Sequence, residues 1–70
     1  MSKLPSSKKV VDILIKNGFM LVSQRGSHQK YTNGILSVIV PSPRKEIPLG
    51  TLKSISRQAG INISKFLLNQ

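Results

Sequence analysis

Residues 28–40 read HQKYTNGILSVIV, a pattern that predicts a β-hairpin. Residues 28–32 and 35–40 are the two expected strands. The dipeptide Asn33-Gly34 lies between them and favours a turn whose two central residues both have positive φ. Side chains alternate between the two faces of a strand. This alternation places three apolar side chains of the second strand on one face: Leu36, Val38 and Val40.

A further strand and a helix are expected on the N-terminal side of the hairpin. Residues 19–24 have the composition of a strand, and Gly26-Ser27 is the turn that joins it to the hairpin. Residues 8–17 carry apolar side chains on one broad face, as an amphipathic helix does. Ser6 and Ser7 are candidate N-cap residues for this helix.

A second helix is expected after the hairpin. Residues 41–46 contain two prolines and two cations, which indicates a solvated loop. Pro48 suits the first turn of a helix, and Gly60 marks its end. Between them, three apolar residues recur at helical spacing: Leu52, Ile55 and Ala59. We expect a last short helical turn over residues 65–68, with Phe66 packed back on the body.

The elements together predict an α+β fold with the order α-β-β-β-α and a short C-terminal helical turn. Two amphipathic helices and a sheet with one apolar face favour a two-layer sandwich, with both helices on one face of a three-stranded antiparallel sheet. The other face would then be exposed, as in double-stranded-RNA-binding domains. The chain has 70 residues, so we expect residues 1–70 to form a single domain.

The charge of the chain points to polyanionic partners. Eleven Lys and Arg residues against two acids leave a net charge of +9. This excess favours nucleic acid first, an acidic protein second and an anionic membrane third. The N-terminal segment is too charged for a signal peptide, and no apolar run is long enough to span a bilayer. The absence of cysteine fits the cytoplasm, where we expect the protein to act without a membrane partner.

The residue types exclude most catalytic schemes. Asp12 and Glu46 are far apart in the sequence and make a poor site for a hard cation. One histidine and no cysteine are too few for zinc. We therefore expect no metal and no cofactor. His28 is the one side chain whose ordinary pKa lies near neutrality, so proton transfer would depend on it.

Cleavage of RNA without a metal fits this inventory. The 2′-hydroxyl of RNA lies beside its own phosphate and can attack it once a base takes its proton. His28 would supply the acid–base group, with Lys30, Tyr31 or a water as the second one. Gly26 permits close approach of a phosphate, and Ser27 can donate a hydrogen bond to it. The candidate phosphate-binding cations are Arg25, Lys30, Lys45 and Lys53.

Less specific interpretations stay open at this point. A lone histidine in a small basic domain is more commonly a phosphate contact than a catalyst. The chain is then an RNA-binding module that does not cut. Alternatively, the basic surface exists only to bind an acidic protein partner.

Five short motifs occur in a fixed order along the chain. They are Asn17-Gly18-Phe19, Gly26-Ser27-His28 with Tyr31, Val40-Pro41, Ile47-Pro48 followed by Gly50-Thr51-Leu52 and Ile55, and Gln58-Ala59-Gly60-Ile61. In this order and spacing, the chain resembles the HicA family of toxin–antitoxin toxins from about Ser7 to Ile61. Gln29 stands where a second histidine is frequent in that family, and Leu49 stands where a lysine is common.

The resemblance implies a fold, an activity and a partner. HicA toxins are compact domains of the double-stranded-RNA-binding type that act as metal-independent ribonucleases on mRNA and so arrest growth. The catalytic histidine of the family falls on His28, and Gly26 and Ser27 shape the site. The cognate antitoxin, HicB, binds the toxin and covers its active site. No metal or small-molecule cofactor is implied.

Overall fold

Six helices and strands follow one another in the computed structural model, which describes residues 4–67. They are α1 (Ser7–Lys16), β1 (Met20–Arg25), β2 (His28–Thr32), β3 (Ser37–Pro41), α2 (Leu49–Ala59) and α3 (Ser64–Leu67). The expected α-β-β-β-α order with a short C-terminal helix is confirmed. None of the described helices is both long enough and apolar enough to cross a membrane.

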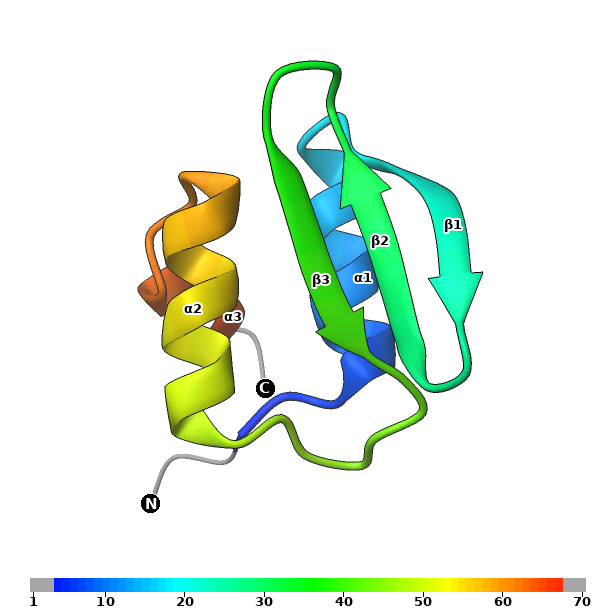
Figure 1. Cartoon of the computed structure of the whole chain (residues 1–70). Helices are drawn as coiled ribbons and strands as arrows, with labels where there is room; N and C mark the ends of the chain where they lie inside the picture. The colour runs from blue at the N-terminus through cyan, green and yellow to red at the C-terminus, as the bar shows by residue number, and fades with distance from the viewer. Residues whose placement is uncertain (1–3, 68–70) are drawn as a thin grey trace.

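The three strands form one antiparallel sheet in the order β1-β2-β3. Its buried face carries Tyr31 opposite Val38, with Val40 two pairs further on. Helix α1 lies behind the sheet, and α2 lies alongside β3 (Figure 1). Both helices contribute to one continuous core with this face, through residues such as Leu14 and Leu52. The two-layer arrangement therefore leaves the other face of the sheet free of helices.

The turn between β2 and β3 is longer than expected. Thr32 pairs with Ser37, so residues 33–36 form a four-residue loop in place of the two-residue turn. Asn33 does not adopt positive φ. Its side-chain Oδ1 instead accepts hydrogen bonds from the backbone N–H groups of Ile35 and Leu36, at 2.9 and 2.7 Å. An asparagine side chain that replaces backbone acceptors in this way stabilises a wider turn, which also delays the start of β3.

Strand β1 differs most from the expectation. It begins one residue late, and all of its side chains are exposed. The register shifts by one residue between Leu21 and Ser23, which marks a β-bulge. A bulge bends its strand and increases the local twist. Leu21 is 47% exposed even though it pairs with the buried Tyr31, because β1 is an outer strand of the sheet.

The helix ends follow local capping chemistry. Ser6 is the N-cap of α1, because its hydroxyl accepts a hydrogen bond from the backbone N–H of Lys9 at 3.1 Å. Gly60 ends α2 in the left-handed conformation, with φ of 67°. The short helix α3 begins at Ser64, whose N–H donates to the side chain of Asn62. Residue 68, which the sequence pattern included in this turn, lies outside the described residues.

Gly60→Ala is expected to lower the free energy of unfolding by about 1 kcal/mol, because alanine is strained at this left-handed φ. The added Cβ would meet only the Leu36 side chain, at an ordinary 3.5 Å, so the penalty comes from the backbone. Gly50→Ala is the matched control: it lies inside α2, in open space and without positive φ. It should be neutral or stabilising. Urea denaturation measures both, and equal losses would contradict this explanation.

Candidate functional site

The turn between β1 and β2 positions the only histidine. Arg25 pairs with His28, so Gly26 and Ser27 form a two-residue turn between them. Gly26 has φ of 55°, a conformation that glycine adopts without strain, and its α-carbon faces open space. His28 is therefore the first residue of β2, exposed at the end of the sheet.

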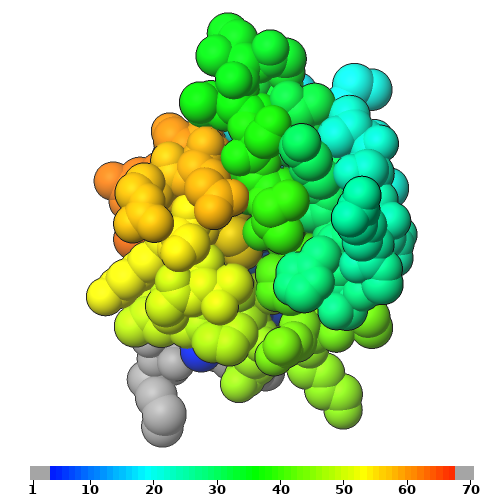
Figure 2. All heavy atoms as spheres, in the orientation of Figure 1, coloured from blue at the N-terminus to red at the C-terminus, as the bar shows by residue number. Residues whose placement is uncertain are grey.

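Side-chain alternation brings His28 together with cations on the open face. Tyr31 points into the core, so His28 and Lys30 point the other way. Arg25 lies directly across from His28, where paired Cβ atoms are about 5 Å apart. A shallow depression of about 330 Å³ results, lined by Ser23, Arg25, His28, Lys30 and Ile39. Figure 2 shows this face, where the side chains of the three strands reach the surface with no helix over them.

Among residues 4–67, no carboxylate lines this depression. Asp12 lies on α1, where it forms an ion pair with Lys8 at 3.8 Å. Glu46 lies in the loop that precedes α2. Since Arg25 and Lys30 have no acidic neighbour among the lining residues, the open face around His28 is positively charged. A phosphate placed here would meet two cations and one imidazole.

Tyr31 is removed as a partner for His28 in proton transfer. Its side chain points to the helix-covered face and is 4% exposed. Its hydroxyl donates a hydrogen bond to Oε1 of Gln29 at 2.9 Å. Burial raises the pKa of Tyr31 above its ordinary value, which keeps the hydroxyl protonated. Of the two side chains considered for the second acid–base group, Lys30 alone shares the face of His28.

Two of the cations expected to bind phosphate lie elsewhere. Lys45 follows β3 and lines a different hollow, together with Ser6 and Lys8 near the start of α1. Lys53 is exposed on α2. Gln58 marks the side of α2 that faces β3, because its side chain accepts a hydrogen bond from the backbone N–H of Ile39. Lys53 comes five residues earlier on the helix, so it lies about 140° around the helix axis from that side. The structure thus brings Arg25, Gly26, Ser27, His28 and Lys30 together at one end of the sheet, whereas Lys45 and Lys53 do not line the depression at His28. A phosphate-binding role for these two lysines stays a prediction.

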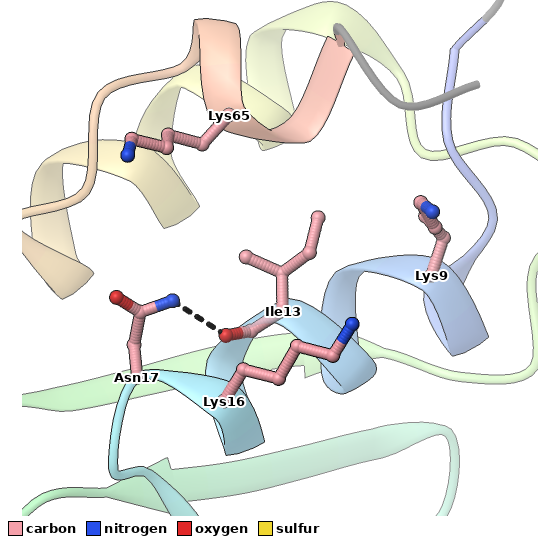
Figure 3. A pocket seen from close by; sticks show the side chains of 5 residues that line it. All are labelled: Lys9, Ile13, Lys16, Asn17 and Lys65. Carbon is pink, nitrogen blue, oxygen red and sulfur yellow. Dashed lines mark hydrogen bonds between the residues drawn. The ribbon is translucent and has the colours of Figure 1, made fainter.

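A second basic hollow lies on the helical side of the molecule. It has a volume of about 510 Å³ and is lined by Lys9, Ile13, Lys16, Asn17 and Lys65. Figure 3 shows these side chains, with the amide of Asn17 donating to the carbonyl of Ile13 at 2.7 Å. This hollow is larger than the one at His28, but no histidine or carboxylate side chain is among its lining residues. It offers charge without acid–base chemistry, so the smaller depression is the candidate active site.

Two residues of the depression, Ser23 and Ile39, were not singled out from the sequence. Both pair with Lys30, one on each side. Counting back from the two-residue turn at Gly26-Ser27 places Ser23 opposite Lys30, so the signal was present. Ile39 could not be placed in the same way, because its register depends on the longer loop after Thr32.

The fold and the site define a small α+β domain with one helix-covered sheet face and one open, positively charged face. The family model of the HicA toxin of bacterial toxin–antitoxin systems matches residues 7–61. The chain therefore belongs to the HicA toxin family, and the resemblance seen in its motifs is confirmed. A toxin of such a system has an antitoxin partner. Comparison with curated proteins gave no match.

Proposed function

We propose that the chain is a metal-independent endoribonuclease that cleaves mRNA, with His28 as the acid–base group. The observation that carries the proposal is the pairing of His28 with Arg25 on an open sheet face that also presents Lys30. Within residues 4–67, no three His, Cys, Asp or Glu side chains are grouped so that they could hold a metal ion. The proposed chemistry needs none.

The reaction is an internal transfer at phosphorus. His28 takes the proton of a ribose 2′-hydroxyl, and the resulting oxygen forms a bond to the adjacent phosphorus. The bond from phosphorus to the 5′-oxygen of the next nucleotide breaks, and that oxygen leaves with a proton supplied by Lys30, water or the protonated histidine. The products are a 2′,3′-cyclic phosphate and a free 5′-hydroxyl. Arg25 and Lys30 stabilise the extra negative charge of the transition state.

The open face suits single-stranded RNA. Its surface is shallow and strand-built, so an extended backbone can lie across it with a phosphate above His28. The turn at Gly26-Ser27 adds backbone N–H groups beside the phosphate, and no Cβ at Gly26 blocks the approach. A basic, shallow face of this kind can contact the backbone of an unpaired strand without reading its bases, which fits single-stranded mRNA as the substrate class.

The chemical groups at the ends of the cleaved RNA test the proposed reaction. The purified chain, incubated with a short RNA in the presence of EDTA, is expected to leave 2′,3′-cyclic phosphate and 5′-hydroxyl ends, identified by mass spectrometry. The same oligonucleotide with 2′-O-methyl groups is the control and should stay intact, because it lacks the attacking oxygen. Cleavage of the methylated strand, or loss of activity in EDTA, would rule out this mechanism.

The second candidate function is RNA binding without cleavage. The same basic face supports it, since phosphate contacts need only Arg25 and Lys30. The product assay separates the two, because a binding module leaves both oligonucleotides intact. The partner completes the proposal: a HicB-like antitoxin holds the toxin inactive in the cytoplasm, where mRNA is found.

A further inference from the structure

The two edges of the sheet differ in how readily they could pair with another strand. At the β3 edge, Pro41 has no N–H group to offer. The N–H of Ile39 donates to the side chain of Gln58 at 3.1 Å, and α2 lies alongside the strand (Figure 1). Proline, a side-chain hydrogen bond and a neighbouring helix are means by which proteins prevent further strand pairing at an edge. The β3 edge is closed to another strand.

The β1 edge has none of these protections. Strand β1 is the outer strand on the other side of the sheet, and it contains neither proline nor lysine. Met20, Leu21 and Val22 are 65%, 47% and 52% exposed. Figure 1 shows no helix beside this edge. A bulge can also turn an edge away from pairing, but the one in β1 is limited to the step between Leu21 and Ser23, and pairing with β2 is regular from Ser23 onward. Exposed apolar edges of this kind accept an added strand.

The geometry points to β1 as the docking edge for a β-strand of the antitoxin, added to the sheet beside the active site. This inference rests on the proposed function only for its consequence, inhibition. An added strand uses backbone N–H and C=O groups together with apolar side chains, which a protein segment supplies and RNA does not. A second copy of this chain is disfavoured by charge, because each copy carries +9. An acidic antitoxin segment satisfies both conditions.

An antitoxin strand bound at the β1 edge would directly affect the candidate active site at His28. A residue of the added strand opposite Arg25 would lie on the open face, about 5 Å away between Cβ atoms. An acidic residue there would pair with Arg25 and remove one of the two phosphate-binding cations. The added strand would lie two strand spacings, or about 10 Å, from His28. Its side chains would narrow the open face on which RNA must lie.

The test measures binding of the cognate HicB-like antitoxin, co-expressed with the toxin and purified. All toxins carry His28→Ala, so binding is read independently of cleavage and of the proposed reaction. Val22→Glu and Met20→Glu are expected to weaken binding about tenfold or more, through lost apolar contact and repulsion of an acidic segment. The matched control is Ile35→Glu, since Ile35 is 89% exposed but lies in the loop between β2 and β3. It should change the dissociation constant by less than about twofold.

Hydrogen–deuterium exchange on the same complexes provides a readout that does not depend on any substitution in β1. The backbone N–H groups of residues 20–25 should exchange more slowly in the complex than in the free toxin. Protection confined to α1, α2 or α3, or equal weakening by Ile35→Glu, would overturn the inference. So would slow exchange in β1 of the free chain together with the mass of a dimer, because a second copy would then occupy the edge.

Discussion

His28→Ala is expected to slow RNA cleavage by about 100-fold or more, the usual contribution of a positioned acid–base group. His28 is the only histidine in the sequence, so no neighbour can replace the imidazole. Arg25 and Lys30 stay in place and should still bind phosphate. Single-turnover cleavage of a labelled RNA measures the rate, and fluorescence anisotropy at matched salt measures RNA binding.

The fold should survive this substitution. His28 is exposed at the first position of β2, and its neighbour across the sheet is a flexible arginine. Ser37→Ala is the control, an exposed change at the opposite end of the same sheet. It should leave both cleavage and binding unchanged. If His28→Ala cleaves at the original rate, the assignment is wrong. If binding and cleavage fall together, His28 acts mainly as a phosphate contact and not as the acid–base group. The binding-only function requires that the unsubstituted chain also leaves the RNA intact.

The helices could be predicted from the sequence because their signals are local. The spacing of Leu52, Ile55 and Ala59 defines one helical face, and all three are buried. Gly60 ends α2 in the conformation for which glycine is preferred. Capping and periodicity depend on neighbours within a few residues, so the sequence contains what is needed.

The exposure of β1 could not be predicted, because it depends on the whole sheet. Its apolar residues Met20, Leu21 and Val22 indicate a strand but do not show whether a helix covers it. The order of the strands, with β1 on the outside, and the position of α2 beside β3 decide that. Similarly, the side chain of Asn33 selected a wider turn than its dipeptide with Gly34 indicates.

The residues of the candidate site were also predictable only in part. Arg25, His28 and Lys30 could be grouped from the sequence, because a two-residue turn and strand alternation determine their relative positions. Lys45 and Lys53 could not, because Lys45 lies in a loop and Lys53 on a helix, and composition alone does not orient either. Charge identifies the candidates for phosphate binding, but only the register of the strands selects among them.

Phe66→Ala is expected to lower the free energy of unfolding by about 3–5 kcal/mol, through lost burial and the cavity that remains. Phe66 is fully buried in α3 and packs in the same core as Val10 and Leu14 of α1. A domain of this length has a total stability of only about 4–10 kcal/mol, so the loss is a large part of it. Much of the chain should be unfolded at 37 °C, as measured by thermal denaturation followed by circular dichroism.

Ile35→Ala is the matched control, because this side chain is 89% exposed and its removal leaves no cavity. It should shift the midpoint of unfolding by little, since exposed substitutions usually change stability by less than about 0.5 kcal/mol. If Phe66→Ala lowered the free energy of unfolding no more than Ile35→Ala does, α3 would not be part of the folded core. A selective loss in Phe66→Ala would instead show that the fold that positions His28 depends on α3. This helix shares the core with α1, α2 and the sheet, but it contributes no residue to the depression at His28.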